Sequence, residues 1–260
     1  MVLTLSPTFL LLLTAVITVS GVVNGLAGFG FAVVGTMALA AIIDPASAVV
    51  IMIIPMLAAN VMLLTELSGE ELRTCGRRFG PLVGSALVGT IVGMVVLETL
   101  PSGPLRVGLG LLTLGFVVSQ QTVVSLPSIG TDGEPTLADR GSMIAIGGVS
   151  GVLFGATNVG VQLVAYLKSQ QLSHSLFVGV VAMVFVGINA IRVGAAGVLG
   201  LYPTLAVFGL SVLTVIPAVA GVAVGSRLRS HVSTRLRRWF VLGLLTVIGI
   251  RLLLGGLGIA

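Results

Sequence analysis

The chain has 260 residues, of which 56% are hydrophobic and only 8% are charged, against roughly 25% charged in an average soluble domain. This composition excludes a soluble globular domain, a disordered chain and a coiled coil, and it indicates an integral membrane protein. The net charge of +5 is typical of basic loops retained on the cytoplasmic side of a membrane. We expect no nucleic acid partner, because no stacking aromatic residues alternate with the basic ones.

Long runs without charge define the predicted helices. Several runs exceed the roughly 20 apolar residues that a helix needs to cross a bilayer, and none alternates in polarity as a barrel strand does. We therefore predict an all-α polytopic membrane protein with about 8–10 transmembrane or re-entrant helices. Charges, prolines and glycines divide the first half into elements over residues 7–24, 28–43, 46–65, 79–98 and 104–124.

A polar segment separates this half from the next. The second half divides into elements over residues 141–155, 157–168, 174–198, 203–226 and 238–258. The chain is thus predicted to hold a first repeat at residues 1–124, a linker loop at 125–140 and a second repeat at 141–260.

The two halves share a glycine-rich pattern near their start. Residues 21–25 run into Gly28 and Gly30, and residues 147–151 run into Gly155. This similarity suggests an internal repeat, although glycine periodicity alone can also produce it.

Both patterns lead into short apolar elements. At 1.5 Å per residue, residues 28–43 extend about 24 Å and residues 157–168 about 18 Å, which is marginal or too short for a crossing. Short, glycine-interrupted segments at matching positions of two halves are typical of broken helices around a transport site. The alternative is a tilted helix whose ends lie elsewhere.

The arginines predict the orientation of the repeats. The loop before the last element carries five arginines and no acidic residue, so it should be cytoplasmic. We expect the first two elements of each half to return together to the side on which they began. On that count the cytoplasmic side also holds Arg73, Arg77 and Arg78, and Arg106 lies outside. Under this count both termini are outside, each half crosses an odd number of times, and the two repeats are inverted.

Polar residues inside apolar segments are the candidates for a binding site, because each must find partners away from water. At the predicted helix breaks, free backbone N–H groups and the positive end of a half-helix dipole suit an anion. For Asn60 and Asn189, interhelical hydrogen bonding is the alternative. Arg192 either faces the pathway or snorkels to the outer surface, and Arg251 lies deep in the last element. The remaining candidates are Asn24, Thr36, Ser150, Thr157, Asn158 and Gln162.

Other residues have structural interpretations. Glycines spaced four apart predict close helix packing, and Pro217 should kink the ninth element. Tyr202 and Trp239 fall at predicted membrane interfaces as belt residues. The glycine pairs are Gly80/Gly84, Gly89/Gly93 and Gly221/Gly225.

Signatures of an enzyme are missing from the sequence. The two histidines, His174 and His231, lie in different parts of the chain, and no pair of carboxylates occurs inside an apolar element. Acid–base or metal-assisted catalysis therefore lacks its usual groups. We expect no enzyme activity, no cofactor and no metal.

Several motifs resemble those of one transporter family. The stretch from Asn24 to Ala32 resembles the first-half signature of the TauE/SafE family, also called the sulfite exporter family. Residues 151–155 are similar to that family's glycine-rich motif, and Tyr166-Leu167 with Asn189 and Arg192 resemble its following segment. The resemblance covers essentially the whole chain. Two departures are Thr36, where a proline is common, and residues 157–159, which replace a usual run of glycines or prolines.

The resemblance implies a multi-pass transporter of a prokaryotic cytoplasmic membrane that exports small sulfur-containing anions such as sulfite or organosulfonates. An anion held between the two helix breaks, with one repeat rocking against the other, is a compatible mechanism. The alternatives are an anion channel and a carrier for a different small solute, and a homo-oligomer is left open. The predicted substrate-binding residues are Asn24, Gly28, Gly30, Ser150, Gly155, Thr157, Asn158, Gln162, Asn189 and Arg192.

Overall fold

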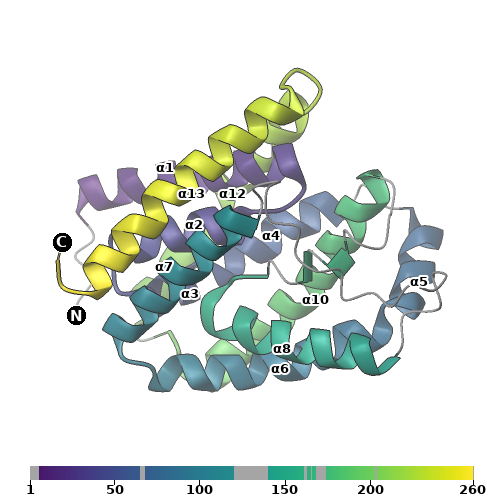
Figure 1. Cartoon of the computed structure of the whole chain (residues 1–260), viewed down its shortest axis with the longest axis horizontal. Coiled ribbons are helices and arrows are strands. Elements are labelled where there is room, and N and C mark those ends of the chain that lie inside the picture. The colour runs from purple at the N-terminus through teal and green to yellow at the C-terminus, as the bar shows by residue number, and fades with distance from the viewer. Residues whose placement is uncertain are drawn as a thin grey trace.

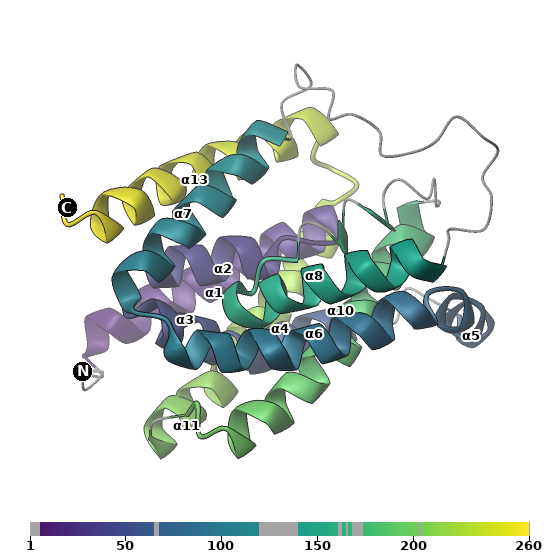
Figure 2. The same ribbon diagram turned by 60° about the horizontal axis from the view of Figure 1, so that its bottom comes forward.

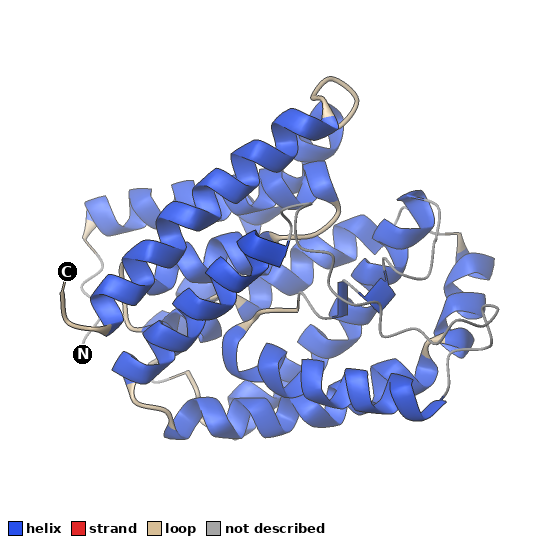
Figure 3. Cartoon of the chain, in the orientation of Figure 1, coloured by secondary structure: helices blue, strands red, loops and turns tan. Residues whose placement is uncertain are grey.

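The computed structural model describes residues 6–64, 68–119, 140–160, 163–164, 166–167, 174–202 and 204–259, and every regular element in these ranges is an α-helix (Figure 3). Six helices are long and apolar enough to cross a membrane. These features confirm the predicted all-α polytopic class. The six are Pro7–Ala27, Pro45–Leu64, Gly80–Thr99, Leu176–Val198, Leu205–Leu228 and Trp239–Gly256.

The first half begins with a capped helix that stops at a glycine. The Ser6 side chain accepts a hydrogen bond from the Phe9 N–H, Pro7 starts the helix, and Gly28 ends it in the left-handed conformation, which is the usual helix stop. The helices in order are α1 (Pro7–Ala27), α2 (Phe31–Ala40), α3 (Pro45–Ile51), α4 (Ile53–Leu64), α5 (Gly69–Arg78), α6 (Gly80–Thr99) and α7 (Ser102–Ser119).

The second half continues with five described helices. They are α8 (Arg140–Thr157), α10 (His174–Val198), α11 (Leu205–Leu213), α12 (Val215–Leu228) and α13 (Thr234–Gly256). Residues 125–139 of the predicted linker lie outside the described part of the chain. Of the predicted element at 157–168, the described residues 163–164 and 166–167 are helical.

Two predicted helices are each broken into two shorter ones, because a proline removes a backbone donor. Residues 46–65 split at Met52, and Pro55 offers no N–H to the carbonyl of Ile51, which instead accepts a hydrogen bond of 2.7 Å from the Ser211 hydroxyl. Residues 203–226 split at Thr214, one turn before Pro217, which confirms the expected distortion there.

The helix α5 was missed by the sequence prediction. Its ten residues contain Glu70, Arg73, Arg77 and Arg78 and are polar overall, so a search for apolar runs assigns them to a loop. The helix ends directly before Phe79, over whose ring the Arg78 guanidinium lies at 5.4 Å.

Glycines bring the helices into close contact across the two halves. The helix α1 packs on α12, and α8 packs on α6 (Figures 1 and 2). A Cβ atom on Gly221 or Gly225 would overlap backbone atoms of α1, and one on Gly89 or Gly93 would overlap backbone atoms of α8. These two pairs are therefore packing glycines as predicted. No described residue outside the helix's own backbone lies within 4 Å of a Cβ built on Gly80 or Gly84, so for that pair the prediction is wrong.

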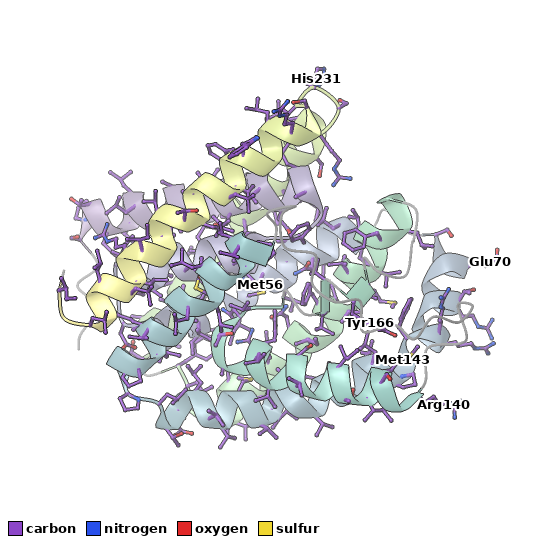
Figure 4. All side chains as sticks on the ribbon, viewed as in Figure 1. Met56, Glu70, Arg140, Met143, Tyr166 and His231 are labelled. Atoms are coloured by element: carbon purple, nitrogen blue, oxygen red, sulfur yellow. The ribbon has the colours of Figure 1, made fainter. Side chains whose placement is uncertain are left out.

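The two chain ends lie together at one end of the molecule (Figure 1). Glu70 and Arg140 lie at the opposite end (Figure 4). This arrangement is compatible with the even number of crossings counted from the arginines, and that count stays a prediction. The side that faces the cytoplasm stays a prediction.

Candidate functional site

Two helix breaks have the same geometry. Gly28 ends α1 with φ of 79°, and its N–H donates to the Asn24 carbonyl at 2.7 Å. Asn158 ends α8 with φ of 61°, and its N–H donates to the Phe154 carbonyl at 2.8 Å. Asn158 is the only non-glycine residue in the described ranges with a positive φ. Asparagine is the residue that replaces glycine most readily in this conformation.

This geometry corrects the alignment of the two halves. The sequence pattern paired Gly28 with Gly155, whereas the structure places Asn158 at the position of Gly28. The glycines at 21, 25 and 30 then have counterparts at 151, 155 and 160, with identical spacing. The predicted correspondence was displaced by about one helical turn.

Both breaks pack against the same helix, α10. A Cβ on Gly28 would overlap the Val178 side chain, and one on Gly160 would overlap the Phe185 ring. Val178 and Phe185 are two turns apart on α10, or roughly 10 Å along its axis. The two breaks predicted as halves of one site therefore lie next to each other on one helix.

Asn158 links the second break to the first half. Its side chain is fully buried, and Nδ2 donates to Thr36 Oγ1 on α2 at 2.9 Å and to the Val49 carbonyl on α3 at 3.0 Å. Its Oδ1 has no hydrogen-bond partner in the described structure. Thr36 and Asn158, which both depart from the TauE/SafE pattern, are thus in direct contact. The free Oδ1 leaves one acceptor inside the protein.

Arg192 is the one charged side chain fully buried in the described structure. Nη1 donates to Asn189 Oδ1 at 3.3 Å, and Nη2 makes a long contact of 3.5 Å with the Gly155 carbonyl. The guanidinium lies 5.1 Å from the centre of the Phe154 ring, which stacks on Phe185. Its Nε has no partner, and no described carboxylate pairs with it. The snorkelling alternative is therefore wrong.

The other predicted residues fall around these two centres. Asn24 is 2% exposed and its Nδ2 has no partner among the described residues. The Thr157 hydroxyl donates to the Leu153 carbonyl and accepts from the Val159 N–H at 3.1 Å, so it stabilises the break itself. Ser150 is buried in α8. Gln162 lies outside the described residues.

Three polar residues differ from expectation or lie apart from the site. The Nδ2 atoms of Asn60 and Asn189 donate to carbonyls one turn earlier in their own helices, at 2.8 Å each, rather than across helices. Arg251 is exposed on α13 and is not part of this cluster. Within the described ranges, no group of three His, Cys, Asp or Glu side chains is placed to hold a metal ion.

A family comparison covers both breaks and Arg192. The model of the family described as Sulfite exporter TauE/SafE matches residues 13–252. The chain belongs to the TauE/SafE family. Comparison with curated proteins and with solved structures gave no significant match. As a TauE/SafE member the chain is a multi-pass membrane protein of a sulfite exporter family, and all its predicted site residues lie inside the matched region.

Proposed function

We propose that the chain exports small sulfur-containing anions, such as sulfite and organosulfonates, across a prokaryotic cytoplasmic membrane. The observation that carries this proposal is the burial of Arg192 without a carboxylate partner in the described structure. An isolated buried charge is costly, and in membrane proteins such charges usually serve function or are paired. An anionic substrate supplies the missing counter-charge.

The surroundings of Arg192 suit a transient anion. Asn189 and Phe154 hold the guanidinium through a hydrogen bond and a ring face, so the group is oriented before the anion arrives. The Nδ2 of Asn24, which has no partner among the described residues, adds a neutral donor without adding charge. Binding by one buried cation and neutral groups is reversible enough for transport.

The proposed mechanism is alternating access between two inverted repeats. The matching breaks at Gly28 and Asn158, and the packing of each half's first helix on a helix of the other half, support this scheme. Rocking one repeat against the other around a site near the middle of the membrane is the usual behaviour of such folds. Where α1 meets α12 and α6 meets α8, the glycines present no side chains, so the helices can shift against each other there during such rocking.

The membrane potential is the proposed driving force. Asp44 lies between α2 and α3, and Glu98 lies exposed at the last turn of α6, so neither of these two carboxylates is placed deep inside a span as a proton carrier. Expelling one negative charge from a negative interior gains roughly 2.3 kcal/mol per 100 mV. Collapsing the potential while keeping the pH gradient should abolish flux, and unchanged flux would rule out this coupling.

Reconstitution tests the proposed function directly. Purified protein in proteoliposomes should move labelled sulfite with saturation and counterflow, and organosulfonates should compete. Empty liposomes give the background. Flux without saturation or counterflow would favour an anion channel, and no flux across a panel of oxyanions would contradict the proposal and favour a different solute.

A further inference from the structure

The break between α3 and α4 leaves two backbone carbonyls for the other half of the chain to bind. In a continuous helix the carbonyls of Val49 and Ile51 would accept from N–H groups four residues later. Here α3 ends at Ile51, and Pro55 in α4 has no N–H to offer. The Val49 carbonyl accepts from Asn158 Nδ2 at 3.0 Å. The Ile51 carbonyl accepts from the Ser211 hydroxyl at 2.7 Å, so two donors of the second half hold this break.

Ser211 stands next to the break of its own span. The helix α11 ends at Leu213, α12 starts at Val215, and Pro217 offers no N–H to the carbonyl four residues before it. The Thr214 hydroxyl donates to the Ser211 carbonyl at 2.8 Å, which fixes the backbone of Ser211 at this break. Since α11 packs on both α3 and α4, the Ser211 side chain joins the break of one span directly to the break of another.

Other buried hydroxyl groups bond differently from that of Ser211. The hydroxyls of Ser20, Thr90 and Thr113 are as deeply buried, and each donates to a carbonyl one turn earlier in its own helix, at 2.6–2.7 Å. This is the usual bond of a serine or threonine inside a helix. Ser211 donates instead to another helix, where Pro55 has left a carbonyl without its N–H. Its bond therefore depends on how α3–α4 and α11 sit against each other.

The bond between Ser211 and Ile51 lies in the interior of the protein. Ile51, Met52 and Ser211 are all fully buried. A buried carbonyl that loses its donor is unfavourable, so this bond favours the arrangement in which the two breaks touch. A single bond of this kind is weak enough to be given up in a conformational change, yet it shifts a balance between two states by about tenfold.

We infer that Ser211 is a positioning residue for transport, which holds the α3–α4 break in the access state of this structure and releases the Ile51 carbonyl when the repeats rock. This inference rests on the proposed alternating access. Helices bend at proline breaks, so the angle between α3 and α4 is the part of this span that rocking can change. Ser211 thus sets the balance between two access states without touching the anion.

Distances between spin labels test this inference on the purified full-length protein without any substrate. Val61 on α4 and Leu205 on α11 are exposed, so Val61→Cys and Leu205→Cys, with Cys75→Ser, give a labelled pair that spans the break. Wild type should show one major distance. Ser211→Ala should raise the population of a second distance about tenfold relative to the first. A lowered unfolding midpoint with unchanged distances would show that the hydroxyl serves only the fold, which overturns the inference.

Two further variants make the result specific. Ser20→Ala removes an equally buried hydroxyl that bonds within its own helix, and it should keep the wild-type distances. Pro55→Ala returns an N–H to the Ile51 carbonyl, so Ser211→Ala should have little further effect in that background. A full tenfold effect of Ser211→Ala in the presence of Pro55→Ala would contradict the assigned contact.

Sulfite flux in proteoliposomes separates this inference from the proposed function. Unchanged distances in Ser211→Ala, together with saturable flux in wild type, would overturn the role of Ser211 and leave the proposed function intact. The expected shift in distances, together with no flux in wild type, would support the role of Ser211 in the conformational change and overturn the proposed substrate.

Discussion

The two helix breaks have the same backbone geometry but different side chains. At the first, Gly28 and Gly30 take up the left-handed conformation and contribute no side chain. At the second, Asn158 adopts that conformation and also binds Thr36 and Val49 of the other half. The first break is a turn made only of backbone, whereas the second is a turn that also connects the halves. Arg192, the one fully buried cation among the described residues, contacts the second break at the Gly155 carbonyl.

This difference suggests a division of roles. A glycine break allows the chain to reverse direction and pack tightly on α10, with Val178 filling the space where a Cβ would lie. An asparagine break holds a position relative to the opposite half. We expect the first break to contribute mainly to stability and the second to contribute to both stability and anion binding.

The largest effect should come from the glycines one turn before each break. A Cβ on Gly25 would overlap the Val222 carbonyl, and one on Gly155 would overlap the Thr90 carbonyl. Because backbone cannot move aside as a side chain can, each Gly→Ala variant should lose about 3 kcal/mol of stability. Thermal unfolding in detergent measures this, with Gly84→Ala as the control in open space. If one variant matched that control, the two breaks would not share the same packing.

The next effect separates the conformation of the first break from its packing. Gly28→Ala places a methyl group at positive φ and against Val178, and it should cost about 2 kcal/mol. Adding Val178→Ala removes the steric overlap but not the backbone strain. Gly28→Ala should therefore lower the unfolding midpoint less in the Val178→Ala background than in wild type. Full additivity of the two losses would show that the side chain contact plays no part.

Asn158→Gly makes the second break resemble the first. Glycine keeps the positive φ but removes the two hydrogen bonds of the amide, at a cost of about 1–2 kcal/mol. Asn158→Ala should lose about 1 kcal/mol more, because alanine is strained in this conformation. Both variants should weaken sulfite binding in the thermal assay. If Asn158→Gly bound sulfite as wild type does, the second break would be only structural.

The smallest effect concerns Asp44, which lies between α2 and α3. Burial alone would raise the pKa of Asp44, but hydrogen bonds from Ser102 and Ser47 and the charge of Arg106 outweigh it and lower that pKa below 3.8. A carboxyl whose pKa is lowered by folding stabilises the protein at pH values above its ordinary pKa. This stability is lost as the pH falls through the pKa of the folded state. Asp44→Asn should therefore flatten the fall in unfolding midpoint below about pH 4. An unchanged profile would contradict this assignment.

Much of the fold is predictable because the length of each apolar run decides whether a helix can span the membrane. The long spans and the glycine contacts of α1 with α12 follow from runs and spacings that can be read along the sequence. The helix α5 is not predictable in this way, because it is polar. The breaks at Met52 and Thr214 lie a few residues before Pro55 and Pro217, so the prolines were the available signal, and only Pro217 was used.

The candidate site was predicted in its residues but not in its contacts. Asn158 and Arg192 stand out in the sequence as polar groups in apolar surroundings. The bond from Asn158 to the Val49 carbonyl leaves no trace in the sequence, since every residue has a carbonyl. Whether Arg192 snorkels or is buried depends on packing by Phe154, and the burial of Tyr202 depends on Phe208. Such tertiary contacts lie beyond local patterns.

The most direct test of the central claim compares two arginine variants. If Arg192 is an unpaired buried charge that awaits an anion, Arg192→Met should leave the ligand-free protein as stable as wild type or more stable. The same variant should abolish the rise in unfolding midpoint on adding sulfite. Arg251→Met, an exposed arginine on α13, should keep that rise. A destabilised Arg192→Met that still responds to sulfite would show that Arg192 serves the fold and that the anion binds elsewhere.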